Sequence, residues 1–173
     1  MRRSQGRTIN AEIAEIAEKR CRGAARSTRF RAVADMLFAF RQVVKDQLNL
    51  LTESIIGAAL EVHRELGPGL LENAYQTCLT VELLNRGHSL ERQKPLPVVY
   101  KNQRMDCGYR LDLVVEGAVI VEIKAVERLE RVHSVQLLSY LRFAKCPVGL
   151  LFNFHAGFLT RDGLKRVVNS FPE

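Results

Sequence analysis

Apolar residues recur at helical spacing along the first half of the chain, and this pattern predicts several helices. A helix with Thr52 as its N-cap has one apolar stripe, formed by Ile55, Ala59, Val62 and Leu66. Gly67-Pro68-Gly69 ends this helix, because proline cannot continue a helix and glycine tolerates a positive φ. A second helix is predicted over residues 70–86. Upstream, helical patterns cover residues 9–19 and 33–44.

After Gly87 the pattern changes to one typical of β-strands. Strands are predicted at residues 90–93, 98–101, 104–115, 119–125 and 148–154, and helices at residues 131–144 and 163–169. Residues 148–154 are almost all apolar, as expected of an interior strand covered on both faces. Asp162 is the expected N-cap of the last helix. This order of elements predicts a mixed α/β or α+β fold.

Composition favours one globular domain with an appendage. The chain has 173 residues, of which 47% are hydrophobic and 26% charged, which suffices for a core without a disulfide or metal. No apolar run approaches the roughly 20 residues of a membrane helix, so we expect no membrane partner. No apolar segment follows the charged N-terminus, so a secretory signal is not expected. The four cysteines lie far apart, which predicts reduced thiols and a cytoplasmic location.

The net charge of +7 is concentrated at the N-terminus. Residues 1–47 hold 11 Lys and Arg against 5 Asp and Glu, whereas residues 48–173 hold 15 against 14. We therefore predict a basic helical extension over residues 1–47 and a main domain over residues 48–173. The extension can be read as a solvated segment, an arm or an oligomerisation segment. If the main domain binds phosphate, a local patch or a metal must do so, because its overall field is weak.

The hairpin predicted around Glu116-Gly117 places two acids together. A two-residue turn would put Asp112 and Glu122 on opposite faces of the sheet. A three-residue loop, Glu116-Gly117-Ala118, puts Asp112 directly across from Glu122, and Gly117 supplies the positive φ that such a loop needs. Residues opposed in this way have Cβ atoms roughly 4.5–5.5 Å apart.

Two carboxylates this close repel each other unless a cation or a proton lies between them. Magnesium prefers oxygen ligands and keeps waters and substrate phosphate in its shell. Lys124 lies two positions beyond Glu122, on the same face, where it could steady or activate a water. The alternative is that Asp112, Glu122 and Lys124 form a structural cluster of salt bridges at a sheet edge.

Two helices offer further polar residues. Glu72 opens the second helix in register with the apolar residues Tyr75, Leu79 and Leu83, so its carboxylate borders the buried side. In the later helix, His133, Gln136 and Tyr140 lie at positions i, i+3 and i+7 and form one row. Structural interpretations compete here, because Glu72 could serve the helix N-terminus and Tyr140 could belong to the core.

The combination resembles a known family. The segments that carry the likeness are Gly69-x-x-Glu72-x-x-Tyr75, Gln93-Lys94-Pro95-Leu96-Pro97, Gly108-Tyr109-Arg110-Leu111-Asp112, Val121-Glu122-Ile123-Lys124, Gln136-Leu137-Leu138-Ser139-Tyr140 and Gly149-Leu150-Leu151-Phe152-Asn153-Phe154. They look like the GxxExxY family, which is grouped with the PD-(D/E)XK nuclease-like superfamily. The likeness covers roughly residues 50–171 in unbroken order and leaves out residues 1–47.

The resemblance implies a restriction-endonuclease-like fold, in which a central mixed sheet is flanked by helices. It also implies roles for particular residues. The metal ligands would be Asp112, Glu122, the Ile123 carbonyl and Glu72, and the other active-site residues would be Lys124, Gln136 and Tyr140. Leu111 stands where the family motif has proline, which is not a metal ligand.

The leading functional hypothesis is a nuclease dependent on Mg²⁺ or Mn²⁺ that hydrolyses phosphodiester bonds in nucleic acid, with DNA as the expected substrate. Lys124 would position the attacking water or stabilise the transition state, and Gln136 and Tyr140 would orient the phosphate or the metal shell. The alternative is a catalytically inactive module of the same fold that binds nucleic acid or protein. In either case, the basic extension could add non-specific affinity for phosphate.

Overall fold

The structure is a computed structural model that describes residues 29–169. The helix predicted over residues 9–19 therefore lies outside the described residues. The chain divides into two units between Asn49 and Leu50. The described part of the first unit is helical, and residues from Leu50 onward form the unit that contains the sheet. Within the described residues, no helix combines the length and apolarity needed to cross a membrane.

Helix α2 (Arg29–Leu66) runs without a break for 38 residues. The prediction that a separate helix begins at Thr52 is therefore wrong. Thr52 is a buried residue in the interior of α2 and not an N-cap. The physical reason is that residues 45–51 contain neither glycine nor proline, so nothing in the backbone stops the helix. Its end at Leu66 is as predicted, since Gly67 follows with a φ of 65°.

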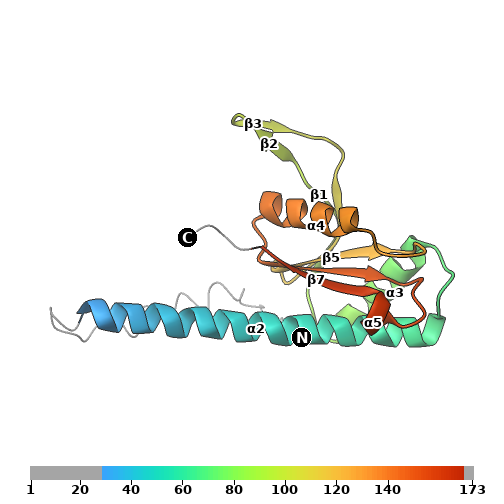
Figure 1. Ribbon diagram of the computed structural model, residues 1–173, viewed down its shortest axis with the longest axis horizontal. Coiled ribbons are helices and arrows are strands. Elements are labelled where there is room, and N and C mark those ends of the chain that lie inside the picture. Colours follow the sequence, from blue (N-terminus) through green and yellow to red (C-terminus); the bar gives the residue numbers. More distant parts are fainter. Residues whose placement is uncertain (1–28, 170–173) are drawn as a thin grey trace, which may run out of the picture. The chain divides into compact units, whose positions relative to one another are not determined.

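The remaining elements follow in the order that Figure 1 shows. They are α3 (Glu72–Asn85), β1 (Leu90–Pro95), β2 (Val98–Tyr100), β3 (Gln103–Met105), β4 (Arg110–Val115), β5 (Val119–Lys124), α4 (Arg131–Ala144), β6 (Val148–Asn153), α5 (Leu159–Asp162) and β7 (Leu164–Val168). Strands β1, β4, β5, β6 and β7 form one sheet in that spatial order, and β2 and β3 form a separate two-stranded sheet. The pairing of β5 with β6 is parallel, and the other neighbours in the large sheet are antiparallel. This mixed sheet with flanking helices confirms the predicted fold class.

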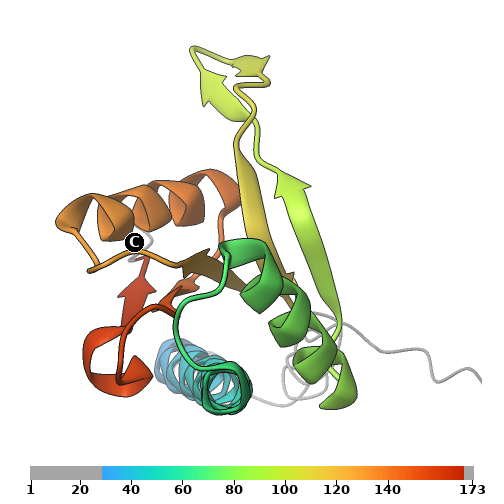
Figure 2. The same cartoon turned by 90° about the vertical axis from the view of Figure 1, so that its right-hand side faces the viewer.

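Helices cover both faces of the large sheet, as Figure 2 shows. On one face α4 buries Leu137 and Leu141 in a core cluster with Val114, Ile120 and Leu151 from three strands. The other face carries α3 and the C-terminal part of α2. Its contacts include the Tyr75 ring of α3, which stacks on Phe154 just after β6 with ring centroids 4.6 Å apart. The interior strand β6 is buried along its whole length, as its apolar sequence predicts.

Two predicted boundaries differ from the structure. Residues 164–168 form the edge strand β7 instead of a helix, and Asp162 ends the four-residue helix α5 instead of capping a new one. The antiparallel ladder with β6 provides this strand with hydrogen-bond partners, which a pattern of single residues does not reveal. The strand predicted over residues 104–115 is split between β3 and β4, and Gly108 between them has a φ of 73°.

The close approach of Gly163 to β6 predicts a specific loss of stability. A Cβ atom at Gly163 would lie 2.6 Å from the main-chain oxygen of Asn153, which cannot swing aside like the end of a flexible side chain because the Asn153 N–H is hydrogen-bonded to the Gly163 oxygen. Gly163→Ala should therefore destabilise the fold by about 1–3 kcal/mol in urea unfolding. Gly157→Ala is the matched control, because nothing lies within 4 Å of its Cβ position. Equal stabilities for the two variants would contradict this packing.

Candidate metal centre

The hairpin of β4 and β5 has the register predicted from its sequence. Val115 pairs with Val119, Val114 with Ile120 and Leu113 with Val121, so the loop contains the three residues 116–118. Gly117 has the expected positive φ of 63°. Glu116 also has a positive φ, and its side chain accepts hydrogen bonds from the main-chain N–H and the hydroxyl of Ser89. The register directs Asp112 and Glu122 toward the same end of the hairpin.

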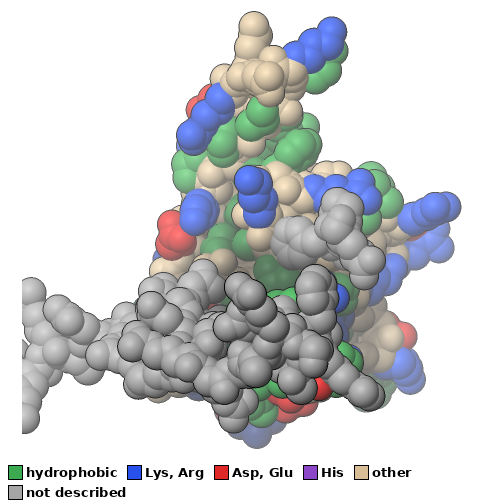
Figure 3. All heavy atoms as spheres, turned by 90° about the vertical axis from the view of Figure 1, so that its left-hand side faces the viewer, with side chains coloured by type: hydrophobic (Ala, Val, Ile, Leu, Met, Phe, Trp, Pro, Cys, Tyr) green, Lys and Arg blue, Asp and Glu red, His purple; other side chains and the backbone are tan. Residues whose placement is uncertain are grey.

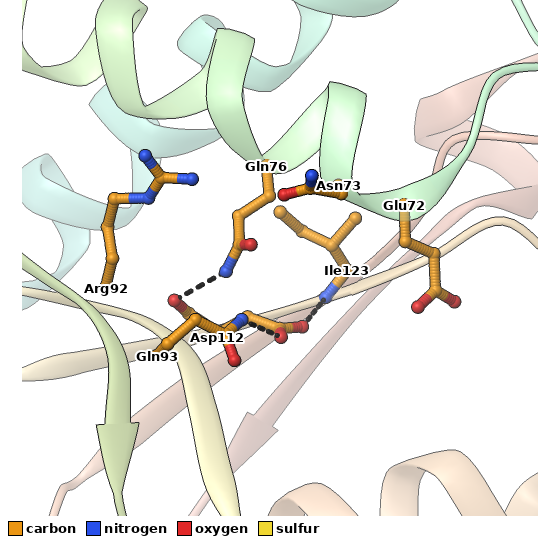
Figure 4. Close-up of a pocket in the computed structure, with 7 residues that line it drawn as sticks. All are labelled: Glu72, Asn73, Gln76, Arg92, Gln93, Asp112 and Ile123. Atoms are coloured by element: carbon orange, nitrogen blue, oxygen red, sulfur yellow. Dashed lines mark hydrogen bonds between the residues drawn. The ribbon is translucent and has the colours of Figure 1, made fainter.

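The ladder between β4 and β5 ends at the pair Leu113–Val121. On the side of this pair away from the turn the two strands separate, and Asp112 lies between them. Its Oδ2 accepts a hydrogen bond of 2.9 Å from the Ile123 main-chain N–H, and its Oδ1 accepts one of 3.1 Å from the Gln93 side chain. The Gln76 side chain of α3 donates to the Asp112 main-chain oxygen at 2.8 Å. Figure 4 shows these three residues converging on Asp112. Asp112 is thus held by contacts with β1, β5 and α3.

Glu122 is the buried member of the acidic pair, with only 5% of its surface exposed. Its Oε2 lies 3.7 Å from Lys124 Nζ, whereas its Oε1 has no hydrogen-bond partner among the described residues. Burial raises the pKa of the Glu122 carboxyl to about 8, and the charge of Asp112 adds to this effect. Lys124 acts in the opposite direction but does not offset them. The pair therefore favours a bound proton or an additional cation.

Of the predicted residues of α4, Tyr140 lies near this pair and Gln136 contacts Tyr140. The Gln136 side chain donates a hydrogen bond of 2.9 Å to the Tyr140 hydroxyl oxygen. Burial raises the pKa of Tyr140, and the charge of Glu122 is the next cause. The phenol therefore stays protonated, and its own O–H remains able to donate. His133 has a different role, because its Nδ1 accepts the Glu130 main-chain N–H and caps α4.

Glu72 reaches the same region from the start of α3. With Asp112, Ile123 and other residues it lines a cavity of about 600 Å³, which Figure 4 shows. Its Oε1 accepts a hydrogen bond of 3.2 Å from the Ala125 main-chain N–H. Across residues 29–169, no three side chains of His, Cys, Asp or Glu are grouped so as to hold a metal ion. The structure thus brings Asp112 and Glu122 together, while Glu72 binds the backbone just after Lys124.

The residues Gly69, Glu72 and Tyr75 act as one local unit. The Tyr75 hydroxyl donates to the Gly67 main-chain oxygen at 2.7 Å and accepts from the Leu70 N–H at 3.0 Å. These bonds fix the turn that leads into α3, in which Gly69 has a φ of 109° that favours glycine. This turn sets the position of Glu72 at the beginning of the helix.

Sequence reasoning missed two buried polar residues that support the site. Gln76 holds the Asp112 main chain, and Asn153 holds the loop after Lys124. Asn153 donates to the Val126 main-chain oxygen at 2.8 Å and accepts from its N–H at 3.0 Å. A signal in the sequence could have indicated both residues, because each is a polar residue among apolar ones. Asn153 ends the apolar strand β6, and Gln76 lies on the buried side of α3.

The donor atoms of this centre fit a hard divalent cation. They include two carboxylates, of which one has a buried oxygen without a hydrogen-bond partner among the described residues. Magnesium and manganese favour oxygen ligands of this kind. The cavity beside Asp112 leaves room for waters or a phosphate group.

The sequence model of the PD-(D/E)XK nuclease superfamily matches residues 49–167. This match covers well over half of the chain, and the chain therefore belongs to the PD-(D/E)XK nuclease superfamily. Comparisons with curated proteins and with solved structures found no significant match. Membership in the superfamily indicates a nuclease-like function, and the acidic centre lies within the matched residues.

The raised pKa of Glu122 predicts how stability depends on pH when a chelator removes metal ions. In the folded protein the Glu122 carboxyl keeps its proton up to about pH 8, whereas in the unfolded chain it releases the proton near pH 4.5. The stabilising contribution of Glu122 is therefore complete below pH 4.5 and is lost as the pH rises toward 8. The side chain in Glu122→Gln is neutral at every pH. The free energy of unfolding of this variant should therefore rise by at least about 1 kcal/mol relative to that of the wild type over this range.

Thermal melting of both proteins in EDTA, from about pH 5 to about pH 8, measures this difference. Glu127→Gln is the control, because Glu127 is exposed and lies in the loop just after the site. A difference between Glu122→Gln and wild type that does not change with pH would show that Glu122 is not buried as described.

Proposed function

We propose that this protein is a nuclease that depends on Mg²⁺ or Mn²⁺ and hydrolyses phosphodiester bonds in nucleic acid, with DNA as its substrate. The observation that carries the proposal is the buried Glu122 carboxylate beside Asp112, with an oxygen that has no partner among the described residues. A protein gains no stability from burying one acid beside another, so the arrangement is better explained by a cation that binds between them.

The ion would be held by the Asp112 and Glu122 carboxylates and by the Ile123 main-chain carbonyl. Glu72 could join this set once its carboxylate leaves the Ala125 N–H. When bound, the ion would supply a polarised water as nucleophile and neutralise charge on the scissile phosphate. The contribution of the chain itself is to hold the two carboxylates at the gap between β4 and β5.

Three further residues would act on the phosphate and the attacking water. Lys124 lies on the same face of β5 as Glu122, and its ammonium group can orient the water or stabilise the developing negative charge. Tyr140 remains protonated and can donate a hydrogen bond to a phosphate oxygen. Gln136 uses its amide N–H to position the Tyr140 hydroxyl. These assignments make Lys124 and Tyr140 catalytic residues and Gln136 a positioning residue.

We also place the chain in the GxxExxY group of the superfamily. The support is the local unit of Gly69, Glu72 and Tyr75, in which each residue has a defined physical role.

The cysteines of the described residues, Cys78, Cys107 and Cys146, are free thiols, which supports a reducing compartment such as the cytoplasm.

One observation favours a second candidate, a catalytically inactive binding module. Within residues 29–169, the acidic residues do not form a group of three that could hold an ion. Such a module would keep the fold and bind nucleic acid or protein without cleaving it. The response to metal and the cleavage rate separate the two candidates.

Metal binding should raise the melting temperature. A cation at a concentration of 100 times its Kd stabilises the folded protein by about 2.7 kcal/mol if it binds the folded state and not the unfolded chain. We expect a shift with MgCl₂ or MnCl₂ in the wild type, and a much smaller one in Asp112→Asn and Glu122→Gln. Glu127→Gln, with its exposed carboxylate outside the pair, should respond like the wild type. Equal shifts in all four proteins would contradict the assigned ligands.

Cleavage of labelled DNA by the purified protein tests the reaction itself. Asp112→Asn and Glu122→Gln should abolish cleavage, and Lys124→Ala should slow it about 100-fold, because each removes a group that acts on the transition state. Arg142→Gln, whose side chain is exposed in the last turn of α4, is the control and should keep the wild-type rate. A wild-type rate in Glu122→Gln would refute the nuclease assignment. A metal-induced shift without cleavage of DNA or RNA would favour the binding module.

A further inference from the structure

The small sheet of β2 and β3 projects from the body of the domain as a two-stranded ribbon (residues 98–105). Figures 1 and 2 show it beyond the ends of β1 and β4, away from the helices that cover the large sheet. Among the described residues, no third strand pairs with it. An isolated two-stranded ribbon is only marginally stable in water, so a ribbon of this kind gains from a bound partner.

The ribbon exposes aromatic and apolar side chains next to cations. Val99 and Tyr100 are each 59% exposed, and Met105 is also exposed. Arg104 lies across the ladder from Val99, and Lys101 Nζ lies 5.3 Å from the centroid of the Tyr100 ring. The eight residues include two cations and no acid. Figure 3 shows Lys and Arg side chains beside hydrophobic ones on this projecting part.

The base of the ribbon is joined to the acidic centre. The Leu96 main-chain N–H donates to the Tyr109 oxygen at 2.8 Å, and β4 then reaches Asp112 two residues after Arg110. The Tyr109 ring is 44% exposed, and its centroid lies 5.9 Å from that of Tyr140. Tyr140 in turn lies close enough to Glu122 to sense its charge. A strand bound along the ribbon would therefore be led past Tyr109 to the two carboxylates.

We infer that the ribbon binds a single-stranded segment of nucleic acid on the face that carries Tyr100, with a base stacked on the Tyr100 ring and a backbone phosphate contacted by Lys101. Arg104 pairs with Val99 and therefore lies on the opposite face of the ribbon. This inference rests on the proposed function. Aromatic side chains stack readily on the splayed-out bases of single strands, and aromatic residues beside cations are the usual surface for such strands. The main domain needs such a local cationic element, because residues 48–173 have a net charge of only +1 and the metal centre is acidic.

Binding can be measured without cleavage, by fluorescence anisotropy of labelled oligothymidine of about 15 nucleotides in EDTA. Tyr100→Ala and Tyr100→Leu should each weaken binding about tenfold, because both remove the ring on which a base stacks. Tyr100→Phe should bind like the wild type. The leucine variant keeps an apolar side chain on the ribbon, so a loss of affinity there cannot be explained by a disordered ribbon alone.

An abasic strand of the same length separates stacking from charge. The affinity for this strand should not change in Tyr100→Ala, because no base is present to stack. Lys101→Gln should weaken binding to both strands and reduce the slope of log K against log salt concentration by about 0.7, whereas Arg104→Gln, on the opposite face of the ribbon, should have a smaller effect. The matched controls are Phe158→Ala for an exposed aromatic ring and Arg161→Gln for the cation 4.8 Å from the centroid of that ring; both lie at α5, on the other side of the large sheet from the ribbon (Figure 1).

Several outcomes would overturn the inference. Wild-type affinity in the Tyr100 and Lys101 variants would exclude the ribbon as the binding surface. Tighter binding to duplex than to single strands, with no effect of Tyr100→Ala, would indicate a duplex-binding ribbon instead. Loss of binding in Phe158→Ala equal to that in Tyr100→Ala would show that the effect of the Tyr100 variants is not specific to the ribbon. Intact cleavage in these variants, together with loss of cleavage in Asp112→Asn, would refute the ribbon's role while leaving the nuclease assignment in place.

Discussion

The hydrogen bond from the Ile123 main-chain N–H to the Asp112 carboxylate is the contact on which the acidic centre depends. It occupies the place that the next ladder bond between β4 and β5 would take, so the strands part where the two acids lie. Buried backbone groups must find other partners when a ladder opens. Here the side chains of Asp112 and Gln76 supply them, so the fold is kept although the ladder opens beside the two carboxylates.

Electrostatics then limits what this pair can bind. Glu122 is buried, and Asp112 adds a second negative charge close to it, so the pKa of Glu122 rises to about 8 in spite of Lys124. One lysine is thus insufficient to keep both acids ionised at neutral pH. A divalent cation would supply the missing positive charge, which agrees with the PD-(D/E)XK nuclease superfamily to which the chain belongs.

The parts of the domain around this centre have separate tasks. Tyr75 fixes the turn before α3, and Asn153 fixes the loop after Lys124, so elements on both sides of the acids are rigidly placed. Gln136 and Tyr140 approach from α4 on the same side as Glu122. The projecting ribbon differs from all of these, since its Tyr100 and Lys101 are exposed and available to a partner.

Much of this arrangement could be predicted from local patterns. The register that aligns Asp112 with Glu122 follows from alternation and from a three-residue loop, and α4 and β6 follow from periodicity and from a run of apolar residues. These features depend on residues near one another in the chain, which is why the sequence by itself determined them. The continuity of α2 through Thr52 and the strand at residues 164–168 were decided by tertiary structure. So were the supporting contacts of Gln76 and Asn153 and the burial of Glu122, because each depends on partners distant in sequence.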